Sequence, residues 1–195
     1  ALAEYIGKRE RVITIEDSAE LQLFHVENLV RLETRNANME GENEITMQDL
    51  IKASLRMRPD RIIVGEVRGA EAMSMLQALS TGHSGSVSSI HANSCRDALR
   101  RLETMVLMGM DMPLAAIQGL IASSVDILIH LGRLTTGKRK ILEICEIKDY
   151  SRAEYDIRTL FQYKAGQTES LEMTGKLFHT EKLKSYGQYE NYCEA

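Results

Sequence analysis

The chain has little of what marks a nucleic-acid-binding, membrane-spanning or disulfide-stabilised protein. Its 24 Lys and Arg residues are outnumbered by 28 Asp and Glu, which leaves a net charge of −4 and no basic excess for a nucleic acid. No apolar run approaches the roughly 18 residues that cross a bilayer, so any membrane association is expected through partner proteins. The three cysteines, Cys95, Cys145 and Cys193, form no CxxC or finger pattern, which predicts reduced thiols in a cytosolic setting.

Proline is also scarce, and its two positions help to divide the chain into elements. Pro59 ends a helix expected over residues 46–56, and Pro113 opens another expected over 113–123. The remaining expected elements are helices near 70–80 and 94–108 and strands over 11–15, 28–34, 61–66, 86–90, 125–131 and 140–148. This alternation predicts an α/β fold with a mainly parallel sheet flanked by helices, in which the last strands are antiparallel.

Hydrophobic residues make up 44% of the 195 positions, which is enough for one core. Residues 1–165 are therefore expected to form one domain. The periodicity is lost from Gly166 onward, and residues 166–195 are predicted to be a C-terminal extension that is a small β structure or partly mobile. Strands around Glu169–Met173 and Lys176–His179 would form a hairpin there.

The stretch RMRPDRIIVGEVRG, residues 56–69, places an acidic side chain at the end of a buried strand. The run Ile62, Ile63, Val64 has no polar alternation, which is typical of a parallel strand covered on both faces. Ligands of such sheets gather at the carboxyl ends of the strands, where Glu66 lies. An acidic residue there can also cap the next helix or face solvent, and the strand pattern leaves both interpretations open.

A second acidic cluster follows the β-branched run at residues 12–15. The segment VITIEDSAEL supplies Glu16, Asp17 and Glu20. Carboxylate oxygens beyond a strand end can hold a hydrated divalent cation or polarise a water molecule, since oxygen ligands and retained waters suit Mg²⁺. The alternative is helix capping by Asp17 or Ser18, with Glu20 completing a capping box.

Two histidines flank a small-residue strand in the segment TGHSGSVSSIHAN, residues 81–93. His83 and His91 could donate to a phosphate oxygen, and imidazole changes its charge near neutral pH. Their spacing fits no common zinc arrangement. A structural role is the alternative for each of them.

Arginines complete the set of candidate residues. They are Arg31 and Arg35 before the loop at 36–43, Arg56 and Arg58 before the Glu66 strand, and Arg68 just after it. A guanidinium group binds phosphate oxygens bidentately and can neutralise charge on a transferring phosphoryl group, including across a subunit boundary. Ordinary surface ion pairs, for example with Glu33, are the alternative.

Four segments resemble, in order and spacing, the motifs of the secretion ATPases of type II and type IV secretion and pilus assembly. They are VITIEDSAEL, LVRLETR, RPDRIIVGEVRG and TGHSGSVSSIHAN. The residues of these motifs are most similar to those of the branch that serves tight-adherence (Tad/Flp) pili. The resemblance spans about residues 1–161 and implies part of a RecA-like P-loop NTPase core, the C-terminal ATPase domain, that uses ATP and Mg²⁺. It also implies a cytoplasmic homo-oligomer, a hexamer, that acts at the inner membrane through a platform protein.

The resemblance also assigns roles to individual residues. Glu16, Asp17 and Glu20 correspond to the family's acidic "Asp box", Glu66 to its modified Walker B acid, and the stretch with His83 and His91 to its "His box". Glu66 and Glu16 would then orient water and Mg²⁺, and His91 would sense the terminal phosphate. Arg31 and Arg35 would be arginine-finger candidates, with Arg56 and Arg58 as further phosphate-binding candidates.

One family motif is absent from these residues: there is no G-x-x-x-x-G-K-[ST] phosphate-binding loop. That loop supplies backbone N–H groups, a lysine and a hydroxyl to the phosphates and Mg²⁺. The sequence therefore leads to the expectation that the chain begins just after this loop and hydrolyses essentially no ATP by itself. The alternatives are a non-catalytic interaction module, a split or degenerate family member, and a metalloenzyme built on Glu16, Asp17, Glu66 and the histidines.

Overall fold

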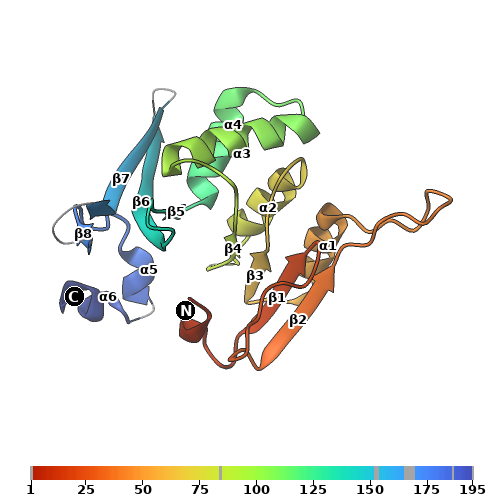
Figure 1. The fold of residues 1–195 in the computed structure, drawn as a ribbon, viewed down its shortest axis with the longest axis horizontal. Coiled ribbons are helices and arrows are strands. Elements are labelled where there is room, and N and C mark those ends of the chain that lie inside the picture. Colours follow the sequence, from red (N-terminus) through yellow and green to blue (C-terminus); the bar gives the residue numbers. More distant parts are fainter. Residues whose placement is uncertain (1, 84, 152–153, 165–169, 186, 195) are drawn as a thin grey trace. The chain divides into compact units, whose positions relative to one another are not determined.

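The computed structural model describes residues 2–83, 85–151, 154–164, 170–185 and 187–194, and its chain divides into two compact units. Unit 1 contains residues 1–91 and 98–124, and unit 2 contains residues 92–97 and 125–195. These units do not coincide with the expected boundary between residues 165 and 166. Figure 1 shows the elements of both units along the chain.

Unit 1 is built on a parallel sheet of four strands in the order β2-β1-β3-β4. The strands are β1 (Arg11–Glu16), β2 (Asn28–Glu33), β3 (Arg61–Val64) and β4 (Val87–Ser88). Residues 12–16 of β1 are all buried, and so are Ile62 and Val64 of β3. The sheet confirms the parallel α/β prediction, because only strands covered on both faces hide consecutive side chains in this way.

Four α-helices complete unit 1, with two short 3₁₀ helices, η1 (Leu2–Tyr5) and η2 (Leu55–Met57). They are α1 (Met47–Ser54), α2 (Glu71–Ser80), α3 (Cys95–Gly109), which starts in unit 2, and α4 (Leu114–Ser124). Thr46 caps α1 in a reciprocal capping box with Asp49, and this hydrogen bonding holds the pKa of the Asp49 carboxyl below its usual range. Helix α1 contacts both β1 and α2, and its Ile51 is fully buried.

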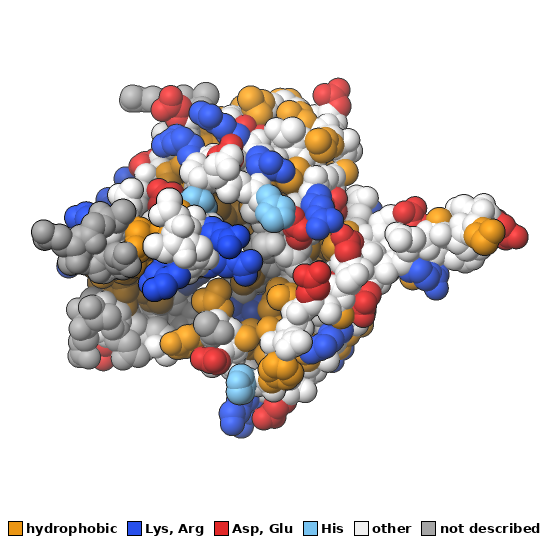
Figure 2. Space-filling model, in the orientation of Figure 1, with side chains coloured by type: hydrophobic (Ala, Val, Ile, Leu, Met, Phe, Trp, Pro, Cys, Tyr) orange, Lys and Arg blue, Asp and Glu red, His pale blue; other side chains and the backbone are white. Residues whose placement is uncertain are grey.

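A long loop leaves the sheet of unit 1 after β2. Residues 36–45 double back on themselves, with Arg35 and Ile45 exchanging two backbone hydrogen bonds at the base. The loop projects away from β1 and β2 (Figure 1), and Figure 2 shows acidic side chains along it. Glu40, Glu42 and Glu44 are all exposed, as expected for a segment rich in Asn, Glu and Gly.

Unit 2 is built on an antiparallel sheet in the order β5-β6-β7-β8. The strands are β5 (Ile127–Arg133), β6 (Arg139–Ser151), β7 (Glu154–Lys164) and β8 (Ser170–Met173), followed by the short helices α5 (Glu181–Ser185) and α6 (Tyr189–Glu194). The buried carboxylate of Glu146 accepts hydrogen bonds from the backbone N–H groups of Phe178 and His179, both at 2.7 Å. It thereby holds the segment after β8 against β6.

Two sequence expectations about the C-terminal part are wrong. The hairpin expected from strands at 169–173 and 176–179 is not formed: β8 pairs with β7 instead, and residues 176–179 are not a strand. The long strand β7 was not expected at all, although Tyr155, Ile157 and Thr159 alternate with charged residues.

Among the described residues, no helix combines the length and the apolar character needed to cross a bilayer.

Gly65 permits a close approach between the ends of β1 and β3. Its backbone N–H donates to Ile15 O at 2.8 Å, and a Cβ at this position would lie 2.9 Å from Cγ of Glu16. Glu16 cannot easily move, because its Oε1 atom accepts hydrogen bonds from the backbone of Glu20 and Leu21. A side chain at position 65 would therefore displace either strand end.

We expect Gly65→Ala to lower the free energy of unfolding by about 1–3 kcal/mol, since the added methyl group overpacks a fixed contact. Gly119→Ala is the matched control: Gly119 lies within α4 with no atom near the added Cβ, so alanine should be neutral or stabilise by up to about 1 kcal/mol. Urea titration of both variants measures the difference. Equal stability of the two variants would contradict the close contact.

Candidate functional site at the carboxyl edge of the parallel sheet

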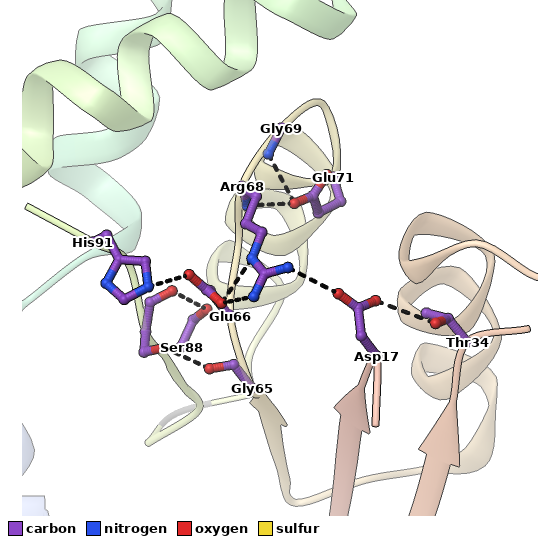
Figure 3. A network of polar contacts seen from close by, with 10 residues as sticks. Asp17, Thr34, Gly65, Glu66, Arg68, Gly69, Glu71, Ser88 and His91 are labelled. Atoms are coloured by element: carbon purple, nitrogen blue, oxygen red, sulfur yellow. Dashed lines mark hydrogen bonds and ion pairs between the residues drawn. The ribbon is translucent and has the colours of Figure 1, made fainter. Parts of the chain in front are cut away.

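Three of the candidate residues of unit 1 lie where its parallel strands end. Glu16 is the last residue of β1, Glu66 follows β3 by two residues, and His91 follows β4 by three. Parallel pairing of β1 with β3 and of β3 with β4 brings these ends to one edge of the sheet. Figure 3 shows Glu66 between His91 and Arg68, with Asp17 beyond the arginine.

Glu66 is the centre of the polar contacts. Its Oε2 atom accepts a hydrogen bond from Arg68 Nε at 2.8 Å and lies 2.6 Å from Arg68 Nη2. Its Oε1 atom lies 2.9 Å from Nε2 of His91. The Glu66 side chain is 20% exposed, whereas those of Arg68 and His91 are 68% and 86% exposed. The carboxylate is thus held in place, while the imidazole and the guanidinium group remain open to solvent.

One oxygen of Glu66 is left with bonding capacity. Oε1 is buried, and its one close partner among the described residues is the exposed His91 ring, whose Nε2 atom lies 2.9 Å away. A buried carboxylate oxygen without a donor is costly and marks a place for an ordered water, an ion or a ligand hydroxyl. This atom therefore fits a water molecule or an oxygen-preferring cation such as Mg²⁺.

The electrostatic environment keeps Glu66 ionised. The hydrogen bond from Arg68 lowers the pKa of the Glu66 carboxyl, with further lowering by the charges of Arg68 and His91, although partial burial acts in the opposite direction. The same contacts raise the pKa of Arg68. The site thus presents a permanent carboxylate beside a permanent cation over the whole neutral range.

Arg68 links the Glu66 region to the acidic segment after β1. Its Nη1 atom lies 3.7 Å from Asp17 Oδ2, and Thr34 Oγ1 donates to Asp17 Oδ1 at 3.2 Å. The backbone N–H groups of Arg68 and Gly69 both donate to Oε1 of Glu71, at 2.6 and 2.9 Å. Glu71 therefore fixes the turn that carries Arg68 at the start of α2.

Glu16 lies at the same edge but has a different local role. It is buried, and its carboxylate holds the backbone of residues 20 and 21. No helix starts at Asp17 or Ser18, so the capping box considered from the sequence is not formed. Glu20 is exposed and close enough to Arg68 to contribute to its raised pKa.

The other candidates do not join the Glu66 cluster through any contact among the described residues. His83 precedes β4, and its Nδ1 atom lies 3.3 Å from Ala78 O at the end of α2. Arg35 donates from Nε to Asn43 O at 2.8 Å, at the base of the 36–45 loop. Three exposed arginines form no ion pair with a described carboxylate: Arg31, Arg56 and Arg58.

Sequence reasoning gave too little weight to three residues of this cluster. Arg68 was noted only as one of several arginines, and Glu71 and Thr34 were not singled out. The spacing of Glu66 and Arg68 on either side of Val67 was the available signal, because residues two apart in an extended segment lie on the same side. The contacts of Thr34 and Glu71 depend on the tertiary structure.

Replacing Arg68 by glutamine should raise the pKa of Glu66 towards the ordinary carboxyl value, because the largest lowering cause is removed. Because the pKa of Glu66 is lowered in the folded state, the ion pair stabilises the fold at pH values above the ordinary carboxyl pKa. This stabilisation is lost as the pH falls through the lowered pKa. NMR titration of the Glu66 carboxyl carbon measures the change. Arg35→Gln is the control, since Arg35 binds a backbone carbonyl, and an unchanged Glu66 pKa in Arg68→Gln would contradict the geometry.

Several named proteins are similar to this chain in sequence. The chain is 36% identical over 149 residues to the type IV secretion system protein PtlH of Bordetella pertussis, covering 74% of this chain and 44% of that protein. It is 37% identical over 146 residues to the conjugal transfer protein TrbB of Rhizobium radiobacter, covering 75% of this chain and 42% of that one. The chain therefore spans less than half of the length of these relatives.

Solved structures show the same architecture. The VirB11 ATPase from the Brucella suis type IV secretion system, solved in complex with sulphate, superposes with a TM-score of 0.66 at 35% identity, over 74% of this chain and 42% of that chain. The Legionella pneumophila ATPase DotB shares the fold, with a TM-score of 0.53 at 23% identity over 72% of this chain and 38% of that one. The predicted fold class, a RecA-like α/β core with a parallel sheet flanked by helices, is confirmed.

The match to the family as a whole is broader than any of these pairwise alignments. Residues 1–184 match the family described as type II/IV secretion system protein. This range includes both units and all four motifs on which the resemblance was based. The chain therefore belongs to the type II/IV secretion system protein family.

Proposed function

We propose that this chain is the carboxylate-bearing part of an ATP-hydrolysing motor that drives secretion, conjugal transfer or pilus assembly. The observation that carries the proposal is the buried Oε1 of Glu66, which accepts no hydrogen bond among the described residues and lies at the carboxyl edge of a parallel sheet. Family membership and the named relatives support the same class of motor.

In the proposed reaction Glu66 holds and orients the attacking water through Oε1. Arg68 keeps the carboxylate ionised and fixes its plane by binding Oε2, so the free oxygen points consistently. ATP and Mg²⁺ are the implied cofactors, and bound Mg²⁺ would supply positive charge against the phosphate oxygens. Glu66 and Glu16 are the proposed metal-side carboxylates, directly or through water.

His91 is the proposed sensor of the terminal phosphate. Its ring is largely exposed and touches Glu66 without donating a hydrogen bond to it, so a small rotation can turn it towards a ligand. Asp17 and Glu20 flank the other side of Arg68 and balance its charge. His83 is retained as a candidate only through the family's histidine motif.

The exposed arginines of unit 1 support action across a subunit boundary. Arg31, Arg56 and Arg58 form no ion pair with a described carboxylate, and an unpaired guanidinium group is available to a phosphate on a neighbouring copy. We therefore propose a closed homo-oligomeric ring, a hexamer by family resemblance, in which Arg31 and Arg35 are the arginine-finger candidates. The ring would work in the cytoplasm, at the inner membrane, on a platform protein.

The finer assignment among secretion systems remains a prediction. The residues of the motifs favour the Tad/Flp pilus branch, while the relatives reported above are named as conjugal transfer and type IV secretion proteins. The second candidate function is a non-catalytic interaction module. These residues contain no phosphate-binding loop, so activity has to be assayed on a protein that contains one.

In a protein that contains the loop, Glu66→Gln should reduce the rate of ATP hydrolysis by roughly 10²–10⁴-fold, because glutamine cannot accept a proton from water. Nucleotide affinity should change little, since the phosphate contacts are made elsewhere. Steady-state phosphate release and fluorescent-nucleotide binding measure the two effects. The matched control is Glu42→Gln on the exposed loop, and full activity of Glu66→Gln would overturn the proposed role.

Action in trans predicts complementation between two inactive proteins. In mixtures of Glu66→Gln and Arg31→Ala subunits, about a quarter of the boundaries in a cyclic ring combine an intact Glu66 with an intact neighbouring Arg31. ATPase activity should therefore recover partly on mixing, relative to either variant alone. Arg35→Ala tests the second candidate in the same way, and no recovery with either arginine variant would contradict arginine fingers at these positions.

A further inference from the structure

Unit 2 contains a cluster of three potential metal ligands that the ATPase site does not use. The cluster consists of Cys95, Glu143 and Cys145, and one ligand atom of each lies within 4.8 Å of the others. All three residues belong to unit 2, because residues 92–97 pack with the antiparallel sheet. No short motif indicates this site, since positions 95 and 145 are 50 residues apart.

Local structure explains why these side chains meet. Glu143 and Cys145 are two residues apart on β6, so both point to the same face of the sheet. Cys95 is the first residue of α3, whose start is fixed by a hydrogen bond from Asp97 N to Ser94 Oγ at 3.0 Å. The Cys95 Sγ atom reaches Leu128 O on the neighbouring strand β5 at 3.8 Å.

The cluster combines burial with weak internal bonding. Cys95 and Cys145 are only 3% and 1% exposed. The Glu143 carboxylate accepts two long hydrogen bonds, both 3.5 Å, from Cys95 N and from Thr159 Oγ1. An ionisable group beside two buried thiols is costly unless it has a strong partner, and these bonds are at the limit of hydrogen-bond length.

We propose that Cys95, Glu143 and Cys145 form a binding site for a thiophilic divalent cation of the zinc class. Zinc binds sulfur at about 2.3 Å and carboxylate oxygen at about 2.0–2.2 Å, so ligand atoms already this close need only small movements to surround one ion. The two buried thiols supply the soft ligands that favour zinc over Mg²⁺. The half-buried Glu143 leaves a route of entry from solvent.

A fourth ligand is available on the neighbouring strand. His130 on β5 is the cross-strand partner of Glu143, and the two side chains are close enough to interact electrostatically. Rotation of the imidazole would complete a set of two sulfur, one oxygen and one nitrogen ligands, which is within the range of tetrahedral zinc. The partial positive charge at the start of α3 offsets part of the ligands' negative charge.

A simple thiol pair explains the cluster less well. A disulfide between Cys95 and Cys145 would need an oxidant and would give no role to the carboxylate between the two strands. A cation would use all three side chains and would join the start of α3 to β6. The Thr159 hydroxyl lies 3.7 Å from Cys145 Sγ and donates a hydrogen bond to Glu143. It would therefore orient two ligands from outside the metal's coordination shell.

The test is metal binding by the reduced protein. After dialysis against a chelator and reconstitution, the wild type should bind one equivalent of Zn²⁺, and Co²⁺ should give thiolate charge-transfer and tetrahedral d–d absorption bands. Zinc should raise the unfolding temperature, because the folded state holds the ligands together and binds the ion more tightly than the unfolded chain does. Cys145→Ser should remove the charge-transfer intensity of one thiolate and the stoichiometric zinc.

Two further variants keep the test decisive if a cysteine variant unfolds. Thr159→Val should weaken zinc binding by about 10- to 100-fold while keeping all ligands, as expected for an outer partner. Cys193→Ser is the matched cysteine control and should bind Zn²⁺ as the wild type does. Failure of the folded wild type to bind Zn²⁺ or Co²⁺ would overturn the proposal, as would rapid formation of a Cys95–Cys145 disulfide in air without metal binding.

Discussion

The parallel pairing of β1, β3 and β4 is the constraint on which the candidate site depends. Each of these strands is short, and each ends in a polar segment that would have no reason to meet the others in an isolated peptide. Because the strands run in the same direction and are adjacent or nearly so, Glu16, Glu66 and His91 arrive at one edge. The buried apolar residues of β1 and β3 therefore position the chemistry as well as hold the core.

Glu66 and its neighbours have different roles in this arrangement. Arg68 occupies one carboxylate oxygen, and Glu71 fixes the backbone that carries Arg68. The remaining oxygen is held in a defined place, and among the described residues only the exposed His91 ring lies close to it. A site prepared in this way needs little rearrangement when a water molecule arrives, which is what electrostatic preorganisation requires.

Much of unit 1 could be predicted from the sequence, because its signals are local. The continuous apolar runs at 12–15 and 62–64 identify buried parallel strands, and Pro59 separates a helix from the strand that follows. Glu66 and His91 were identified by their positions beyond strands, and the structure brings them together. The contacts of Thr34 and Glu71 could not be predicted, since they depend on how loops from different strands pack.

Unit 2 was harder to predict, although its antiparallel strands pair in sequence order, β5-β6-β7-β8. Strand β7 pairs with β6 through two register shifts. Its alternation at the start of the strand is lost over residues 157–161, which are all buried or partly buried. Strand β8 pairs with β7, and only residues 165–169 lie between the two strands. This stretch contains Gly166, a turn signal that competes with Thr174-Gly175. The meeting of Cys95 with Glu143 and Cys145 likewise requires knowledge of where α3 begins in space.

The contact between Glu146 and the segment after β8 has a consequence for how the chain tolerates change. Both carboxylate oxygens are satisfied by backbone groups of Phe178 and His179, deep within unit 2. The two backbone donors do not depend on the side chains at positions 178 and 179, although the His179 ring adds a further contact, with Nδ1 3.3 Å from Oε1 of Glu146. Proteolytic loss of the segment would leave the buried negative charge of Glu146 without its hydrogen-bond donors. The antiparallel sheet therefore needs this segment to cover Glu146.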